Sequence, residues 1–199
     1  MGKQDLLFEI ADRQQGYFTF RQARDCGYYD PNVQRYIRSG EWLKVGRGLY
    51  RLARYPVPDR PDLVEWSLWS RNKRGEPQGV WSHETALDSY DVCDIMPSKL
   101  HMTVPKDFRR SVSLPSSLKL YFADLAESDW IEHQGYRVTT LVRTLIDLAA
   151  SRQVSDDLLK QAVQEGRQQG MLTKEHVQNL PDNDAGELLR KFYEEAGRF

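Results

Sequence analysis

The sequence predicts an α+β protein, and three observations support this fold class. Residues 3–52 combine apolar side chains at helical spacing with two alternating segments around a Gly-Arg-Gly turn. Residues 100–138 contain further segments in which apolar and polar side chains alternate, as in strands with one buried face. Residues 141–196 return to helical spacing. Helices and strands are therefore grouped along the chain, which is typical of the α+β class.

The charge of the chain is divided unevenly between its parts. The formal net charge of the 199 residues is only −1, which by itself argues against a nucleic-acid partner. Residues 1–55, however, carry ten basic and six acidic side chains, a net charge of +4, and residues 56–199 carry the balance of −5. A basic segment beside an acidic one indicates two parts with different partners.

The two cysteines, Cys26 and Cys93, are isolated in the sequence, so we expect neither a disulfide framework nor a zinc site. The chain does not begin with the apolar core of a signal peptide, and its apolar runs are shorter than a membrane span. These features predict a cytoplasmic protein with no membrane partner, no metal and no cofactor.

Three prolines between Arg54 and Pro61 predict the domain boundary. Proline lacks an amide donor and favours an extended path. We therefore expect an N-terminal domain at residues 1–54, a linker at 55–61 and a second domain at 62–199.

The N-terminal domain is predicted to contain three helices. The first covers residues 3–14, whose apolar side chains recur on one helical face. The second begins with the capping box Thr19-Phe-Arg-Gln22, in which two side chains bind free amides of the helix start. The third begins at Asp30-Pro31, where Asp30 is expected as the N-cap, and ends before Gly40.

A basic hairpin is expected after the third helix. Residues 42–45 and 49–52 alternate like strands around Gly46-Arg47-Gly48, whose glycines allow the positive φ angles of a tight turn. Three helices followed by such a hairpin is the order of a winged helix-turn-helix domain.

The third helix carries the candidate DNA-reading residues. Its apolar side chains share one face, which leaves polar and basic side chains on the opposite face. In a winged helix this helix enters the major groove and the hairpin contacts the backbone or the minor groove. The alternative is that the arginines only solvate the outer face of a small domain. The candidate contacts are Asn32, Gln34, Arg35 and Arg38 of the helix and Arg47 of the hairpin tip.

The second domain is predicted to be mixed, with a mainly antiparallel sheet and C-terminal helices. A loop is expected at 72–79, and Ser82 is expected to cap the helix that follows it. Arg143 and Asp147 stand four apart on a helix, where they can pair on the surface. The strands are expected at 100–104, 118–122, 130–133 and 136–138. The helices are expected at 63–69, 82–90, 141–150, 156–169, 173–180 and 185–196.

No catalytic constellation is found, so the sequence predicts a protein that is not an enzyme. Ser82-His83-Glu84 contains the residue types of a catalytic triad, but neighbours in sequence do not form a triad, and helix capping explains the serine better. Glu84 and Asp88 have no histidine at metal-ligand spacing. Nuclease, nucleotidyltransferase, phosphate-loop and dinucleotide motifs are absent from the sequence.

Two charged segments of the second domain are further candidates. Lys106, Arg109 and Arg110 surround Phe108 and either extend the nucleic-acid surface or form a solvated loop. The acidic segment Asp124–Glu132 either binds a basic protein partner or faces solvent.

Six motifs occur in order along the chain: Phe18-Thr-Phe-Arg-Gln-Ala23, Tyr36-Ile-Arg-Ser-Gly-Glu-Trp-Leu43, Val45-Gly-Arg-Gly-Leu-Tyr-Arg51, Ser82-His-Glu-Thr-Ala-Leu87, Leu100-His-Met-Thr-Val-Pro105 and Val138-Thr-Thr-Leu-Val-Arg-Thr-Leu-Ile-Asp147. Together they resemble the AbiEi family, the antitoxins and transcriptional regulators of AbiE-type (type IV) toxin–antitoxin systems. Within the last motif the segment Arg143–Asp147 is intact, but Leu141-Val142 before it lacks the proline often seen in the family.

The resemblance implies an autorepressor that binds inverted repeats in the promoter of its own operon and takes part in phage defence by abortive infection. It implies double-stranded promoter DNA as a partner and a nucleotidyltransferase toxin that the second domain counteracts, with or without a stable complex. A monomer that pairs cooperatively on DNA fits this implied function. The alternatives are an antidote that binds the toxin directly through its acidic second domain, and a stand-alone regulator. Carried over by position, the implied DNA contacts are Gln34, Arg35, Arg38, Lys44, Arg47 and Arg51.

Some relatives with a similar N-terminal part continue into a nuclease-like domain. The present sequence ends at Phe199, and we expect it to be too short for one.

Overall fold

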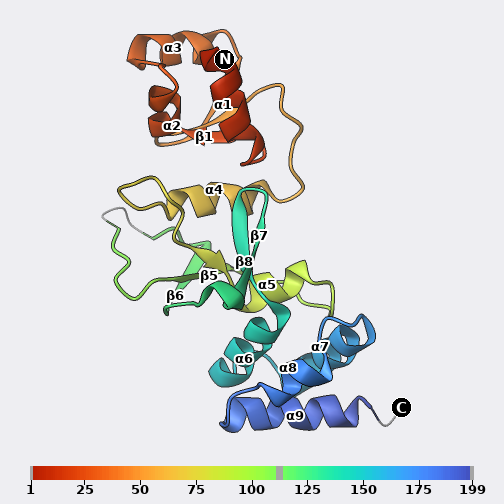
Figure 1. Cartoon of the computed structure of the whole chain (residues 1–199). Helices are drawn as coiled ribbons and strands as arrows, with labels where there is room; N and C mark the ends of the chain where they lie inside the picture. The colour runs from red at the N-terminus through yellow and green to blue at the C-terminus, as the bar shows by residue number, and fades with distance from the viewer. Residues whose placement is uncertain (1, 111–113, 198–199) are drawn as a thin grey trace. The chain divides into compact units, whose positions relative to one another are not determined.

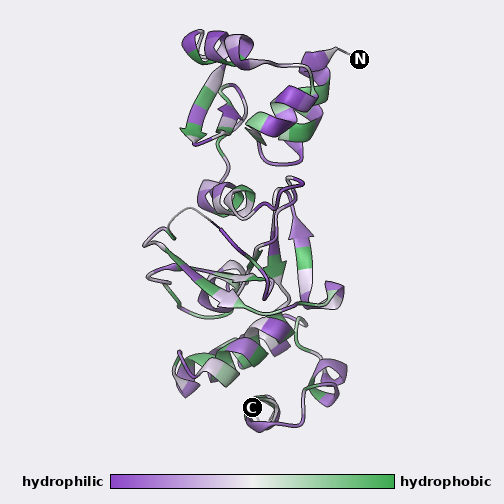
Figure 2. Ribbon diagram, turned by 90° about the vertical axis from the view of Figure 1, so that its left-hand side faces the viewer, coloured by the Kyte–Doolittle hydropathy of each residue, from purple (hydrophilic) through white to green (hydrophobic). Residues whose placement is uncertain are grey.

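The computed structural model describes residues 2–110 and 114–197 (Figure 1). The chain forms two compact units. The first comprises the residues up to Gly79 together with Glu132–Tyr136, and the second comprises Val80–Ile131 and the residues from Arg137 onward. Hydrophilic and hydrophobic stretches alternate along the helices in Figure 2, as expected of amphipathic helices with one buried face.

The first unit has the element order of a winged helix. A three-stranded antiparallel sheet in the order β1-β3-β2 pairs the hairpin with a short strand between the first two helices. That strand was not predicted, because three residues are too few to show alternation. The elements are α1 (Lys3–Asp12), β1 (Tyr17–Thr19), α2 (Phe20–Asp25), α3 (Asp30–Arg38), β2 (Trp42–Gly46), β3 (Leu49–Leu52) and α4 (Pro61–Trp69).

Local signals place the helix starts as predicted, with one shift. Thr19 Oγ1 accepts a hydrogen bond from the amide of Gln22 (3.2 Å), and Gln22 Oε1 accepts one from the amide of Thr19 (2.8 Å). The capping box is therefore confirmed. At the start of α3 the N-cap is Tyr29, not Asp30, so Asp30 and Pro31 lie inside the first turn. In the first turn the negative carboxylate of Asp30 still interacts favourably with the positive end of the helix dipole.

Both faces of the small sheet are covered. Phe18 and Tyr50 point to one face, where they pack with Trp42 and the helices α1 to α3. Their strand neighbours Tyr17 and Leu49 point to the other face and pack against α4. This three-stranded sheet, β1-β3-β2, is called the wing sheet below. It is the middle layer of the first unit.

The border between the compact units lies after Gly79, C-terminal to the proline-rich segment 55–61. The reason is the packing of α4, since Val64 and Leu68 are fully buried against the wing sheet. The prolines therefore do not separate the two units. The division into a functional DNA-binding domain at 1–54 and an antitoxin domain at 62–199 stays a prediction.

A five-stranded sheet in the order β6-β5-β4-β8-β7 belongs mainly to the second unit, and the turn end of β7 and β8, Glu132–Tyr136, belongs to the first. The expected α+β class with C-terminal helices is confirmed, but this sheet is mixed: β4 and β5 are antiparallel, while β5–β6 and β4–β8 are parallel. Parallel neighbours need long connections, and alternation within a strand does not show them. The strands are β4 (Val80–Trp81), β5 (Leu100–Val104), β6 (Leu118–Phe122), β7 (Trp130–His133) and β8 (Tyr136–Thr139).

The helices of the second unit enclose its main core. Leu145 and Leu148 of α6 pack with Leu159 of α7 and with Leu189 and Phe192 of α9. In the described ranges 2–110 and 114–197, no helix is long and apolar enough to cross a membrane. The helices are α5 (His83–Ser89), α6 (Leu141–Ser151), α7 (Asp156–Gln168), α8 (Lys174–Gln178) and α9 (Asp184–Glu195), with a 3₁₀ turn η1 (Glu127–Asp129).

The last of the six motifs holds α6 in place. Arg143 binds Asp147 (3.0 Å) within the helix and Asp129 of η1 (3.3 Å), and these groups are largely shielded from solvent. The predicted pair therefore forms, but it is not a surface pair. Thr144 Oγ1 also shares a hydrogen bond of 2.7 Å with Thr139 Oγ1 at the end of β8.

The packing of α4 against the wing sheet is tested by Leu68→Ala. Because Leu68 is 0% exposed, we expect the free energy of unfolding of the first unit to fall by about 2–5 kcal/mol. The measurement is denaturant unfolding monitored by tryptophan fluorescence. Val57→Ala is the matched control, since Val57 is 77% exposed and its truncation should change stability by less than about 0.5 kcal/mol. Equal stability of the two variants would contradict the placement of α4.

Candidate nucleic-acid interface

The outer face of α3 presents three of its four predicted DNA contacts. Gln34, Arg35 and Arg38 are exposed, whereas Asn32 is half-buried. Val33, which is 1% exposed, fixes the opposite face of the helix in the core. The interior packing therefore determines which side chains α3 exposes to solvent.

The hairpin turn presents two further predicted contacts. Lys44 and Arg47 are exposed, and Arg47 lies between Gly46 and Gly48 at the tip. Gly48 has φ of +67°, a conformation that glycine adopts at little cost. The register shifts between Lys44 and Gly46, and such a bulge increases the local twist of the hairpin. The tip therefore carries a single exposed guanidinium on a tight turn.

Arg51 does not belong to this surface. It is 7% exposed, and its guanidinium donates hydrogen bonds to the carbonyl oxygens of Tyr55 (2.5 Å) and Pro56 (2.7 Å). The cause is strand alternation: Arg51 pairs with Tyr17 and points to the sheet face that packs against α4. Its role in this structure is to bind the segment after β3.

Residues 5–53 match the family model described as transcriptional regulator, AbiEi antitoxin. The resemblance inferred from the sequence is confirmed for this segment, which contains all seven predicted DNA contacts. An AbiEi-like N-terminal segment supports a DNA-binding regulatory antitoxin.

A solved structure, that of the RV2827C protein from Mycobacterium tuberculosis, is similar to nearly the whole chain. It shares 12% sequence identity with a TM-score of 0.56, and the match covers 98% of this chain and 77% of that one. At this identity the likeness shows a common fold. No curated protein matches the chain in sequence.

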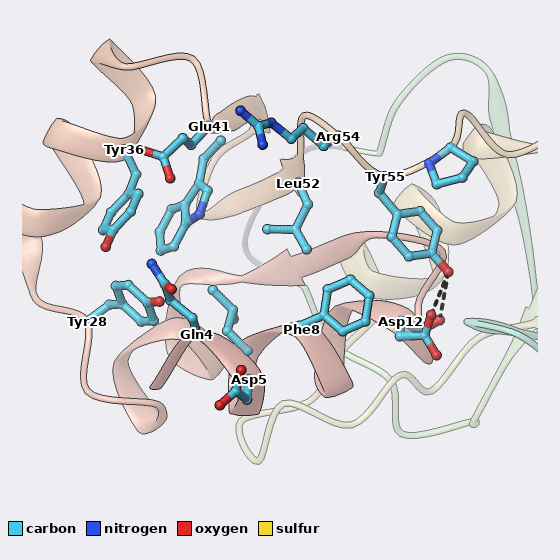
Figure 3. A pocket seen from close by; sticks show the side chains of 13 residues that line it. Gln4, Asp5, Phe8, Asp12, Tyr28, Tyr36, Glu41, Leu52, Arg54 and Tyr55 are labelled. Atoms are coloured by element: carbon cyan, nitrogen blue, oxygen red, sulfur yellow. Dashed lines mark hydrogen bonds between the residues drawn. The ribbon is translucent and has the colours of Figure 1, made fainter. Parts of the chain in front are cut away.

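The AbiEi-like unit also has a face that is unsuited to DNA. A pocket of about 790 Å³ is lined by aromatic side chains, the carboxylates of Asp5, Asp12 and Glu41 and a single basic residue, Arg54 (Figure 3). Tyr36 of α3 lines it, two residues from both Gln34 and Arg38 and therefore on the other side of the helix. Phosphates would be repelled by these carboxylates. The acidic pocket and the predicted DNA contacts therefore lie on different sides of α3.

The second basic segment offers less charge than its sequence suggests. Lys106 Nζ lies 3.7 Å from the carboxylate of Asp124, and Phe108 is buried. Arg110 is half-buried, and burial lowers the pKa of its guanidinium. Of the three predicted residues, Arg109 is exposed and Lys106 is exposed but paired. The acidic segment is likewise partly paired, since Asp129 binds Arg143. A DNA contact at this loop stays a prediction.

The Ser82 motif lies in a buried polar cluster. Ser82 occupies the N-cap of α5, but its hydroxyl does not cap the helix as predicted. It accepts a hydrogen bond from Thr103 Oγ1 (2.8 Å) and lies 2.9 Å from His83 Nδ1. Thr85 Oγ1 accepts one from the amide of His101 (2.8 Å). The two motifs at 82–87 and 100–105 therefore meet in the fold, which sequence spacing could not show.

This cluster has the properties of a structural core. His83 stacks on Tyr121 with ring centres 3.5 Å apart and is held at φ of +52°, a strained angle for histidine. Ser82 is 0% exposed, and its hydroxyl binds Thr103 inside the cluster. Within residues 2–110 and 114–197, no group of three or more His, Cys, Asp or Glu side chains could hold a metal ion.

Replacing each arginine of the wing separates a structural role from a surface role. Arg51→Ala removes a buried side chain together with its hydrogen bonds to the carbonyl oxygens of Tyr55 and Pro56, so we expect the free energy of unfolding to fall by about 1–3 kcal/mol. Arg47→Ala removes an exposed side chain and should change it by less than about 0.5 kcal/mol. Urea denaturation of both variants measures the difference. A loss of stability confined to Arg47→Ala would reverse the two assignments.

Acid should destabilise the second unit through its two buried histidines. Burial lowers the pKa of His83 to about 3 and that of His101 to about 4, against 6.5 in an exposed histidine. The unfolded chain therefore binds more protons below pH 6.5, and stability falls as the pH decreases from 6.5 toward 4. Each histidine should cost roughly 2 kcal/mol at pH 5. Denaturant unfolding of wild type and of His101→Gln between pH 7 and pH 5 tests this, and an equal slope in the two proteins would contradict it.

Proposed function

We propose that this protein is a sequence-specific DNA-binding antitoxin that represses its own operon. In this function α3 enters the major groove at promoter inverted repeats and the β2–β3 hairpin contacts the backbone beside it. The observation that carries the proposal is the combination of the AbiEi match at residues 5–53 with three exposed polar and basic side chains on the outer face of α3. In this proposal the chain acts by binding and not by catalysis, and its second unit counteracts a nucleotidyltransferase toxin.

The residue types on α3 support base recognition. Arg35 and Arg38 are able to bind guanine in two-donor geometry, and Gln34 is able to bind adenine. Lys44 and Arg47 of the hairpin carry charge without the orientation that base recognition needs, so they suit phosphates. Asn32 is half-buried at the start of the helix and can contribute a contact at the edge of the site.

The division of charge favours contact through one unit. The segment with a net charge of +4 contains α3 and the hairpin, and the remaining residues carry −5. DNA is therefore attracted to residues 1–55 and repelled, on average, by residues 56–199. Inverted repeats place two such units on neighbouring turns of the duplex, so cooperative pairing of monomers on DNA is part of the proposal.

Direct capture of the toxin by the acidic segment is the competing function. Asp124 and Asp129 are already bound to Lys106 and Arg143, which reduces the free negative charge of that segment. The two functions are distinguished by co-purification of the chain with the toxin at physiological salt. Joint elution favours direct capture, and separate elution with intact neutralisation in cells favours repression with an indirect antidote.

Substitutions on α3 and the hairpin should affect DNA binding in different ways. Arg35→Ala should weaken binding to the region upstream of the protein's own gene by about 1–3 kcal/mol and relax the sequence preference, because a base contact is lost. Arg47→Ala should weaken binding to all duplexes and reduce the salt slope by about 1. Fluorescence anisotropy across a range of salt concentrations measures both effects. Arg13→Ala, at the exposed C-cap of α1, is the charge-matched control. Wild-type binding by both test variants would contradict the proposed interface.

A further inference from the structure

The loop Asn72–Gly75 belongs to the first compact unit although sequence analysis placed it in the second domain. It follows α4, which packs against the wing sheet, and it carries two adjacent basic residues, Lys73 and Arg74. Both side chains are exposed, and neither forms an ion pair in the part of the chain that the structure describes. The loop therefore adds two free cations to the unit that carries α3 and the hairpin.

The loop has a defined backbone. Asn72 Oδ1 accepts hydrogen bonds from the amides of Arg74 (2.8 Å) and Glu76 (3.1 Å). The amide of Asn72 donates to the carbonyl of Glu76 (2.8 Å), and that of Gly75 donates to the carbonyl of Asn72 (3.0 Å). Gly75 has φ of +93°, which only glycine adopts readily. Lys73 and Arg74 are thus displayed on a closed turn and not on a flexible tether.

The loop lies beside the start of α2. Arg21 Nη1 donates a hydrogen bond to the carbonyl of Lys73, and a Cβ at Gly75 would lie 3.6 Å from Arg21 Cδ. In helix-turn-helix proteins the helix that precedes the recognition helix crosses the DNA backbone. α2 is that helix here, so the loop is attached to an element that faces phosphates.

The loop segment also reaches the wing. A Cβ at Gly48 would lie 3.8 Å from the guanidinium of Arg71, the residue before the loop, and 3.9 Å from Phe20 Cβ. The amide of Phe20 donates to the carbonyl of Gly48 (2.9 Å), which ties the hairpin turn to the start of α2. The turn that carries Arg47, the first residues of α2 and the 72–75 loop are therefore neighbours.

The charges of this region are mainly positive. Its exposed carboxylates are Asp25, which lies 3.9 Å from Arg21, and Glu76, which accepts a hydrogen bond from Asn72. Arg47, Lys73 and Arg74 are exposed and form no ion pair within residues 2–110 and 114–197. Basic side chains on rigid turns beside a wing suit the phosphates of a continuing duplex.

We propose that the Asn72–Gly75 loop is a second backbone-binding wing, in which Lys73 and Arg74 bind phosphates next to those bound by the hairpin turn. The inference rests on the proposed DNA-binding function and deepens it. The contact is independent of sequence, so it increases affinity and salt dependence without changing which bases are preferred. Arg21 acts as a positioning residue, since its hydrogen bond holds the loop against α2.

The test uses the full chain and two probes, the duplex upstream of its own gene and a random-sequence duplex of equal length. For the double variant Lys73→Ala/Arg74→Ala we expect the salt slope to decrease by about 1.8, with roughly tenfold weaker binding to both probes at physiological salt. The ratio of the two affinities should stay at its wild-type value. Asn72→Ala, which removes the side-chain hydrogen bonds of the turn, should give a smaller loss in the same direction.

The control is Lys174→Ala/Lys191→Ala, which removes two exposed charges from the second unit. A loop variant whose slope and affinity equal those of this control overturns the second wing, provided that Arg35→Ala still weakens promoter binding. A change in the ratio of the loop variant's affinities for the two duplexes also overturns it, because the loop would then contribute to base preference. Absence of promoter binding by the wild-type chain instead refutes the proposed function itself.

Discussion

The burial of both faces of a three-stranded sheet governs the first unit. Successive residues of a strand point to opposite faces, so Tyr17 and Phe18 must pack into different layers. α1 to α3 cover one face and α4 covers the other. This arrangement orients α3 by its contacts with Trp42, assigns Arg51 to the interior, and brings the chain after α4 back to the hairpin turn.

The same constraint separates charges that are close together in the sequence. Arg47 and Arg51 are four residues apart, but the first occupies a turn without a covering layer and the second a face beneath α4. Lys73 and Arg74 are distant in sequence and return to the side of the hairpin because α4 lies between. Exposed basic side chains of the first unit therefore come from α3, the hairpin turn and the 72–75 loop among other segments, while the carboxylates of Asp5, Asp12 and Glu41 line the pocket.

The second unit uses its motif residues for internal contacts. Ser82, Thr103 and His83 form one buried cluster, and Arg143 connects α6 to η1. Both arrangements satisfy polar groups inside the unit, where an unpaired group would be costly. The motifs that carry the family resemblance in this part of the chain thus have a structural explanation, because their side chains satisfy one another inside the unit.

Sequence alone determined the features that depend on neighbouring residues: the capping box at Thr19, the three helices, the hairpin around Arg47 and the amphipathic division of α3. These follow from hydrogen bonds and periodicities within a few residues. Tertiary structure alone decided the burial of Arg51, the mixed pairing of the second sheet, the contact between the Ser82 and His101 motifs and the place of the 72–75 loop. Each depends on which distant segment covers a given face, and burial by a distant segment leaves no local pattern in the sequence.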